Sequence, residues 1–297
     1  MWKGVIVLKK NNSGYKEFNE AADELDLLVS EGYFGEETRL LLEDRDNYED
    51  EDYLIRILTE WHEDKNQANK NKTYEYTLII FNLYVQAIKE NQGESLELIS
   101  SFKLGAKGNT AMEFMTSYTE YLRVINDSKY LAKELNADRQ NLSKKIRYAK
   151  SISVAYSNGI EYISKTLNLL ICLEKIVNKE SYNFNEINKM ALFEKLNLFN
   201  SSNKYDVLLE MINRNLRNAE AHGTINFVLK TNSYKIKYQK KGKTKEKNIS
   251  FQFLLEKLIF VGNYAQSFEF AGQLLLIGLK DQEKFVKIYN TLFSDNT

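Results

Sequence analysis

Residues 205–238 read YDVLLEMINRNLRNAEAHGTINFVLKTNSYKIKY, and the spacing of hydrophobic residues changes inside this stretch. In the first half, apolar residues recur mostly every three or four positions, as on one face of a helix: Tyr205, Leu208, Leu209, Ile212, Leu216 and Ala219. After Gly223 they recur every second position on both sides of a turn at 231–233, namely at Ile225, Phe227, Leu229, Tyr234, Ile236 and Tyr238. The stretch therefore predicts a helix over 205–222 followed by a β-hairpin.

Helical spacing dominates the rest of the chain. The sequence has no proline and only 13 glycines, a composition that permits long uninterrupted helices. Helical patterns cover residues 18–29, 38–42, 53–61, 74–89, 95–104, 111–125, 140–177 and 187–198. The segment 140–177 is either one long helix or two helices separated near Asn158 and Gly159, and Ser250 is placed to cap a final helical region. We expect a mainly α protein.

The formal net charge of zero conceals a division along the chain. Residues 1–120 carry 13 basic and 24 acidic side chains, a net charge of −11, whereas residues 121–297 carry 28 and 17, a net charge of +11. We predict a boundary where the charge changes sign. An acidic helical domain of no assigned family would occupy 1–125, and a helical bundle 126–297. The basic half suits RNA binding, because phosphate neutralisation dominates affinity for nucleic acid.

Three residues near the end of the predicted 205–222 helix form the candidate site. Asn218 and His222 are four positions apart, so they share one helix face. Arg217 lies about 7.5 Å from His222 along the helix axis and is rotated from it by roughly 140°. That rotation is too wide for one small ligand in a monomer. It suits a groove shared between two helices.

The pattern Arg217-Asn218, three residues, then His222-Gly223 resembles the signature of the HEPN superfamily (higher eukaryotes and prokaryotes nucleotide-binding). Many members are metal-independent endoribonucleases of toxin–antitoxin, abortive-infection and CRISPR systems. The resemblance covers about residues 130–290 and does not extend to 1–125. It implies a four- or five-helix bundle that carries the motif, with a β-hairpin after the motif helix. It also implies a composite site in a homodimer, where Asn218 orients its neighbours.

The chemistry of RNA cleavage fits these residue types. Attack by a ribose 2′-hydroxyl needs a base, an acid and positive charge on the phosphorane. Histidine transfers protons near neutral pH, and the planar fork of arginine matches phosphate. One motif holds a single histidine, so a base and an acid together require two motifs, which predicts a homodimer through the motif helix. Arg214, one turn before Asn218, is a further candidate phosphate contact.

The basic residues of the predicted hairpin are the other candidate RNA contacts. They are Lys235, Lys237, Lys240, Lys241, Lys243 and Lys245, of which the segment 240–245 is expected to be a mobile basic loop. The acidic residues 43–52 are expected to cover this basic surface weakly, as a restraint that an antitoxin or a phage-derived trigger would lift.

Metal and cofactor sites are not expected. His62 lacks a second histidine at ligand spacing, and residues 105–110 form a turn rather than a phosphate loop. Cys172 lies in an apolar run and is interpreted as a buried hydrophobic residue. The apolar segment 251–279 is interrupted by charged residues, so we expect a pair of core helices there, no membrane span and a cytoplasmic protein.

Three other interpretations stay open. The residues 217–223 could be an ordinary helix end, with His222 capping the last carbonyls and Gly223 as the left-handed stop. A domain of this type could also bind RNA, nucleotides or a partner protein without cleaving RNA, or the chain could be a structural helical interaction protein.

Overall fold

The computed structural model describes residues 27, 29–32, 36–49, 52, 53, 56, 66–104, 110–201, 204–221, 223–240 and 243–293. The helices expected over 18–29 and 53–61 and the turn at 105–109 lie wholly or mostly outside these residues, as does His222.

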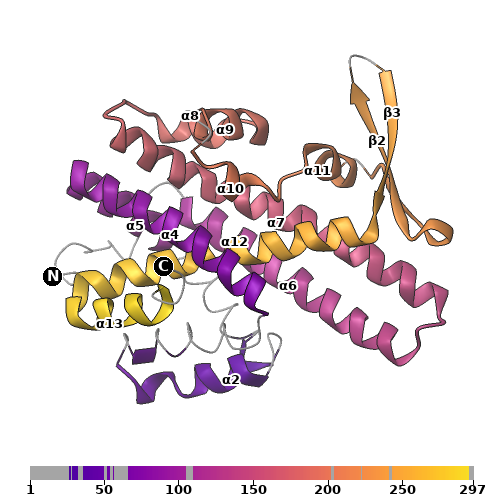
Figure 1. Ribbon diagram of the computed structural model, residues 1–297, viewed down its shortest axis with the longest axis horizontal. Coiled ribbons are helices and arrows are strands. Elements are labelled where there is room, and N and C mark those ends of the chain that lie inside the picture. Colours follow the sequence, from indigo (N-terminus) through magenta and orange to yellow (C-terminus); the bar gives the residue numbers. More distant parts are fainter. Residues whose placement is uncertain are drawn as a thin grey trace.

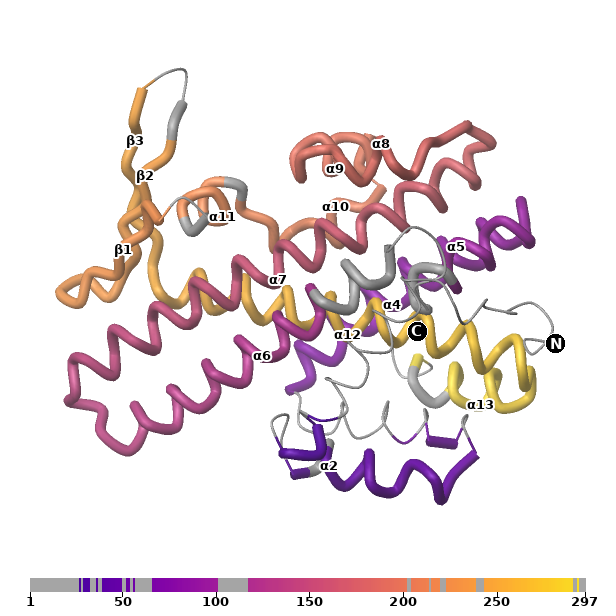
Figure 2. The backbone as a smooth tube through the Cα atoms, turned by 180° about the vertical axis from the view of Figure 1, so that it is seen from behind, coloured from indigo at the N-terminus to yellow at the C-terminus, as the bar shows by residue number. Residues whose placement is uncertain are grey.

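The described part of the chain is mainly helical, as predicted, with one small antiparallel sheet (Figures 1 and 2). The elements in chain order are α2 (Glu36–Glu43), η2 (Arg45–Asn47), α4 (Gln67–Glu90), α5 (Gln92–Leu104), α6 (Thr110–Ala137), α7 (Leu142–Val177), α8 (Phe184–Lys189), α9 (Leu192–Phe199), α10 (Asp206–Leu209), α11 (Arg214–Ala221), β1 (Ile225–Val228), η3 (Leu229–Thr231), β2 (Ser233–Lys240), β3 (Lys243–Ser250), α12 (Phe251–Lys280) and α13 (Gln282–Phe293).

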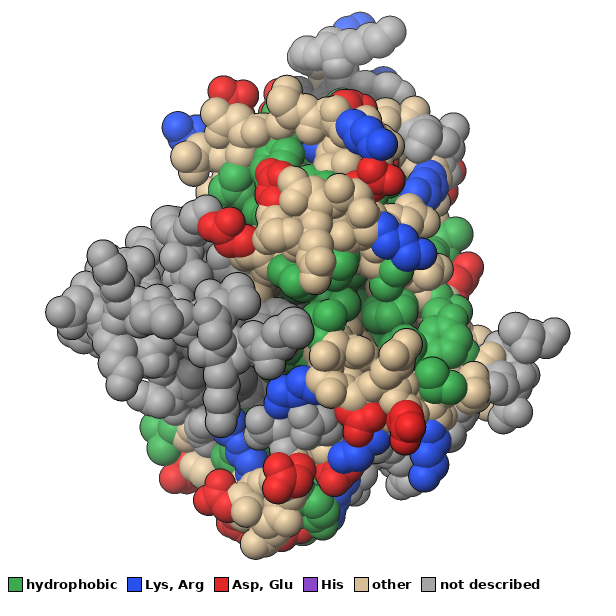
Figure 3. Space-filling view, turned by 90° about the vertical axis from the view of Figure 1, so that its left-hand side faces the viewer, with side chains coloured by type: hydrophobic (Ala, Val, Ile, Leu, Met, Phe, Trp, Pro, Cys, Tyr) green, Lys and Arg blue, Asp and Glu red, His purple; other side chains and the backbone are tan. Residues whose placement is uncertain are grey.

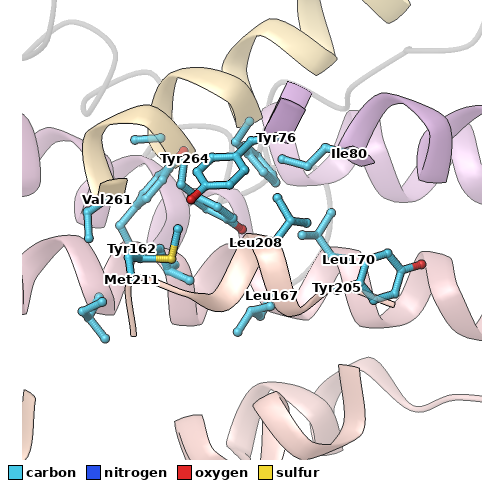
Figure 4. Close-up of a cluster of buried hydrophobic side chains, with 14 of the residues drawn as sticks. Tyr76, Ile80, Tyr162, Leu167, Leu170, Tyr205, Leu208, Met211, Val261 and Tyr264 are labelled. Atoms are coloured by element: carbon cyan, nitrogen blue, oxygen red, sulfur yellow. The ribbon is translucent and has the colours of Figure 1, made fainter. Parts of the chain in front are cut away.

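Helix α7 is the centre of the fold, and α4, α6 and α12 pack against it. Its residues from Leu167 to Leu173 are all buried, because neighbouring elements cover this part of the helix on every side. The core between α4, α7 and α12 is rich in tyrosine (Figure 4). Fully buried tyrosine rings add large apolar areas to the core. Some of their hydroxyls form hydrogen bonds: the Tyr264 and Thr166 hydroxyl oxygens lie 2.7 Å apart, and the Tyr156 hydroxyl donates to Met211 O, just before α11.

Gly159 explains how α7 stays continuous through a segment where a break was an alternative. The helix runs unbroken from Leu142 to Val177. A Cβ atom at Gly159 would overlap Val261 Cγ1 of α12 and lie 2.9 Å from Tyr121 Cε2 of α6. The glycine therefore lets three helices approach closely, and it interrupts none of them.

Residues on the two sides of the expected boundary near 126 belong to one continuous helix and pack in one core. Helix α6 runs from Thr110 to Ala137 without interruption. Helix α4, from the acidic half of the chain, packs against α7 and α12 from the basic half. The segment 251–279 forms the single helix α12 and not the expected helix pair. Among the described helices, none combines the length and hydropathy that a bilayer-spanning segment requires.

The sheet has the strand order β1-β2-β3, with both pairs antiparallel. The predicted hairpin is confirmed, because Ile225 pairs with Ile236 and Phe227 with Tyr234. The expected loop at 240–245 is wrong: β2 continues to Lys240, and β3 begins at Lys243 as a third strand. Backbone pairing forms β3 although only Ile249 on it is buried. Ser250 caps α12 as predicted, accepting a hydrogen bond from Phe253 N at 3.1 Å.

Candidate functional site

The candidate motif lies on a shorter helix than its sequence spacing predicts. The expected helix over 205–222 is two helices, α10 and α11, interrupted at residues 210–213. The hydroxyl of Tyr156 on α7 occupies the break: it donates to Met211 O at 2.9 Å and accepts from Asn213 N at 2.7 Å. The Asn213 side chain then accepts from Leu216 N at 3.1 Å, as an N-cap does. A buried hydroxyl from another helix therefore replaces the helical hydrogen bonds at this point.

Helix α11 buries one face and leaves part of the motif accessible. Leu216 and Ala219 are buried in the same core as α7 and β2, whereas Arg217 and Asn218 are half-buried. The helix ends at Ala221, and Gly223 follows with φ of +61°, the left-handed conformation expected of a helix stop. The motif backbone is thus held by packing on one side and by a capped helix end.

Glu161 of α7 is the partner of Arg217. Arg217 Nη2 lies 3.3 Å from Glu161 Oε2, and the side chains are 35% and 45% exposed. A partly exposed ion pair of this kind is worth about 0–1 kcal/mol. A pair this weak leaves the guanidinium able to exchange Glu161 for another anion. No spacing in the sequence links two residues so far apart, so Glu161 could not be predicted.

The other motif residues are placed less completely. The side chain of Asn218 makes no hydrogen bond within the described part of the chain. The backbone of Arg214 begins α11, but its side chain and all of His222 lie outside the described residues. The structure therefore brings Arg217 and Asn218 together on the last turns of α11, with His222 next in the chain after Ala221.

A charged contact ties the α10–α11 junction to the N-terminal half. The Glu210 carboxylate accepts from the Tyr76 hydroxyl at 2.6 Å and pairs with Lys72 Nζ at 2.9 Å, both on α4. Lys257 Nζ of α12 donates to the Glu210 carbonyl oxygen at 2.5 Å. Lys72 and Lys257 both lie over the ring of Phe260. The position of the segment before the motif is therefore set by α4 and α12.

The contacts of Glu210 also keep it ionised. Burial would raise the pKa of this carboxyl, but hydrogen bonds from Tyr76 and Lys72 outweigh burial, and the pKa lies below its ordinary value. The pKa of Tyr76 is raised, first by burial and then by the neighbouring Glu210 carboxylate. Tyr76 therefore stays a protonated donor to an ionised acceptor near neutral pH.

The hairpin lysines do not share one surface. Paired residues in antiparallel strands lie on the same face, so the register puts Lys245 beside Tyr238 and Lys247 beside Ile236. Lys235 and Lys237 lie on the opposite face, where Glu246 pairs with both, at 2.6 and 3.6 Å. The predicted set of RNA contacts is therefore divided. The side chains of Lys240 and Lys241 lie outside the described residues.

The acidic segment 43–52 does not cover the basic hairpin. Helix α2 and the hairpin lie on opposite sides of the molecule (Figures 1 and 2). Asp44 pairs with Arg56, and Asp52 pairs with Lys284 of α13, each at 2.9 Å. The expectation of an acidic cover is thus wrong for the residues that the structure describes.

The described residues at the end of the molecule away from the hairpin form no continuous basic surface (Figure 3). On this face the described acidic and basic side chains are interspersed (Figure 3). A cavity of about 560 Å³ lies between α4, α5 and α7, but three carboxylates line it, those of Glu90, Glu94 and Glu180. Lys179 also lines the cavity, so its charged side chains sum to a net charge of −2, which does not favour binding of a phosphate group.

Within the described part of the chain, no three or more His, Cys, Asp or Glu side chains lie close enough together to hold a metal ion. Cys172 is fully buried, and burial first, with the charge of Glu94 second, raises the pKa of its thiol to about 12. The interpretation of Cys172 as a buried hydrophobic residue is confirmed. His62 lies outside the described residues.

Comparison with known proteins finds no match to any family model, curated protein or solved structure.

Proposed function

We propose that this protein is an endoribonuclease that cleaves RNA by attack of a ribose 2′-hydroxyl on the adjacent phosphorus, without a metal ion. The observation that supports it most is the setting of the motif. Arg217 and Asn218 are half-exposed on α11, whose opposite face is buried, and His222 is the next residue in the sequence after Ala221, the last residue of α11. The similarity of residues 217–223 to the HEPN signature points to the same chemistry.

Each residue has a role in the proposed reaction. The 2′-oxygen forms a bond to phosphorus and the bond to the 5′-oxygen breaks, which yields a 2′,3′-cyclic phosphate and a 5′-hydroxyl. His222 takes the proton from the 2′-hydroxyl or gives one to the leaving oxygen. Arg217 stabilises the charge on the phosphorane, and Asn218 orients the reacting groups. These groups supply both proton transfers and the positive charge, so the step requires no metal.

The reaction needs a base and an acid, and each chain supplies one motif histidine. We infer that two copies of α11 face each other across a two-fold axis, so that each site contains groups from both chains. Specific activity should then fall when the protein is diluted below its dimer dissociation constant. A mixture of Arg217→Ala and His222→Ala proteins should recover little activity, because a mixed dimer retains only one His222. Full activity of a monomer, measured by light scattering, would exclude this arrangement.

The HEPN resemblance also supports a biological role as a toxin or phage-defence effector. In that role the chain would be regulated by an antitoxin or a phage-derived trigger. Such a partner could act on the α10–α11 junction at Glu210, because contacts from α4 and α12 set the position of this segment before the motif.

A second candidate function is supported by the Arg217–Glu161 pair. If the guanidinium serves mainly to fasten α11 to α7, the domain would bind RNA, a nucleotide or a partner protein without cleaving RNA. The two functions differ in what Glu161 should do. In an enzyme, substitution of Arg217 should abolish cleavage and substitution of Glu161 should not. If the ion pair is purely structural, substitution of either residue should have the same effect on the protein.

The experiment that tests the proposal measures cleavage of tRNA and total RNA by four proteins. We expect the native protein and Glu161→Gln to cleave RNA. Arg217→Ala and His222→Ala should lose activity by about 10²-fold or more, the usual effect of removing a general acid–base group. All four should have the same helical content by circular dichroism. Undiminished cleavage by His222→Ala would overturn the proposal, and RNA binding without cleavage by the native protein would favour the second function.

A further inference from the structure

We propose that one face of the β2–β3 hairpin, the lysine face formed by Lys243, Lys245 and Lys247, binds the phosphate backbone of RNA. The opposite face would not bind. The inference rests on the proposed function, since it takes RNA as the partner. RNA bound on the lysine face would extend from the hairpin toward α11.

The hairpin stands away from the helical body next to α11 (Figure 1). Strand β3 lies at the edge of the sheet, and every one of its residues except Ile249 is exposed. An exposed edge strand rich in lysine is protected from pairing with other strands, which accounts for some positive charge here. Protection alone does not require the lysines to be concentrated on one face.

The register assigns the lysines to faces. Tyr234 pairs with Ile249 at the base of the hairpin, and both are buried, so this face turns toward the body. Residues at alternate positions along a strand share a face, so Lys247, Lys245 and Lys243 continue the same face toward the tip. Successive lysines are about 6.8 Å apart, given a rise of about 3.4 Å per residue.

The charges of the two faces differ. Within the described part of the chain, none of the three lysines on the lysine face forms an ion pair. On the other face, Lys235 and Lys237 share the carboxylate of Glu246. The lysine face therefore carries three uncompensated positive charges, whereas Lys235, Lys237 and Glu246 on the other face sum to a net charge of +1. Uncompensated lysines are what an anionic backbone binds, with release of its counterions.

The lysine face begins beside the strand against which the motif helix packs. Helix α11 packs against β2, and Leu216 of α11 belongs to the same core as Tyr234 and Ile236. A strand of RNA along the three lysines would therefore extend toward α11. Lysine contacts of this kind are made to phosphates rather than bases, so binding should be independent of sequence and sensitive to salt.

The test compares two variants of the full chain that remove charge from opposite faces. One is the triple variant Lys243→Gln, Lys245→Gln, Lys247→Gln, and the matched control is the double variant Lys235→Gln, Lys237→Gln. The probe is a fluorescent 2′-O-methyl RNA 20-mer, which cannot be cleaved by 2′-oxygen attack. Anisotropy is measured over a range of salt concentrations, with circular dichroism to verify folding.

We expect the triple variant to bind at least tenfold more weakly. Its slope of log K against log salt should fall by about 2, since each phosphate contact to a single strand contributes about 0.7. In the control, the slope should change by less than about 0.7, the value of one phosphate contact.

Equal effects of both variants, or none from the triple variant, would overturn the inference even if the native protein cleaves RNA. Binding that depends on the lysine face without any cleavage would instead refute the proposed function alone. Loss of binding to phosphatidylserine vesicles, with RNA binding unchanged, would assign the face to a membrane and overturn the inference.

Discussion

A substitution of Gly159 by alanine tests the packing at the centre of the fold. In an ordinary helix interior this change stabilises a protein by about 1 kcal/mol, because alanine has the higher helix propensity. At Gly159 the new Cβ atom would overlap Val261 Cγ1 and lie 2.9 Å from Tyr121 Cε2. Both neighbours are buried, so neither side chain can move into solvent. Overpacking of this kind costs about 1–3 kcal/mol or more.

The matched control is Gly262→Ala on α12. The nearest atom to its new Cβ is the Tyr121 hydroxyl oxygen at 3.6 Å, an ordinary contact distance. We therefore expect Gly262→Ala to stabilise the protein by about 0.5–1 kcal/mol and Gly159→Ala to destabilise it by about 1–2 kcal/mol. Urea unfolding followed by circular dichroism measures both, provided that the m-values agree. A Gly159→Ala protein as stable as the control would refute the account of this helix crossing.

Glu210 and its neighbours provide the remaining stability predictions. Glu210→Ala should lower the free energy of unfolding by about 2–3 kcal/mol, because buried Tyr76 loses a charged acceptor. Glu75→Ala removes only an exposed partner of Lys72 and should lower it by less than about 0.5 kcal/mol. Urea unfolding measures both differences. Because the folded pKa of Glu210 is lowered, its stabilisation is present above the unfolded pKa of about 4.3 and is lost as pH falls through the folded value. The stability difference between native protein and Glu210→Gln should therefore shrink from pH 6 to pH 3, and a constant difference would contradict the assignment. Tyr156→Phe should cost about 1–3 kcal/mol in the same assay, since it leaves two backbone groups at the α10–α11 junction without their partner, and an unchanged midpoint would show that the junction does not depend on this hydroxyl.

Local spacing was sufficient to predict some of the regular elements. The helical period over 140–177 corresponds to α7 within two residues at its start, and the two-residue period after Gly223 corresponds to β1 and the first part of β2. Ser250 and Gly223 were recognisable because capping and the left-handed stop depend on single residues. These features need no information from distant parts of the chain.

The differences between prediction and structure arise from contacts over long sequence separations. The break before α11 depends on the Tyr156 hydroxyl, which lies on another helix. Strand β3 has almost no hydrophobic alternation, so only its pairing with β2 makes it a strand. Gly159 signals a break when read locally, but its neighbours on α6 and α12 make it a packing position.

The candidate site also contains residues that local sequence predicts and residues that only the fold reveals. Arg217 and Asn218 were identified from the spacing of the motif alone, and the faces of the hairpin lysines follow from strand register, which the sequence did not fix. Glu161 and Glu210 had no signal, because their roles come from side chains on other helices. The candidate motif residues could be identified from local sequence, whereas the side chains that contact them or the preceding junction required the fold.

The central claim is that RNA is cleaved through the 2′-hydroxyl without a metal. The most direct measurement is the chemistry of the new RNA ends after incubation with the purified protein in excess EDTA, beside the same reaction with His222→Ala. The account predicts 2′,3′-cyclic phosphate and 5′-hydroxyl ends from the native protein and almost none from the variant. Cleavage that requires magnesium, or new ends that carry a 3′-hydroxyl, would contradict it.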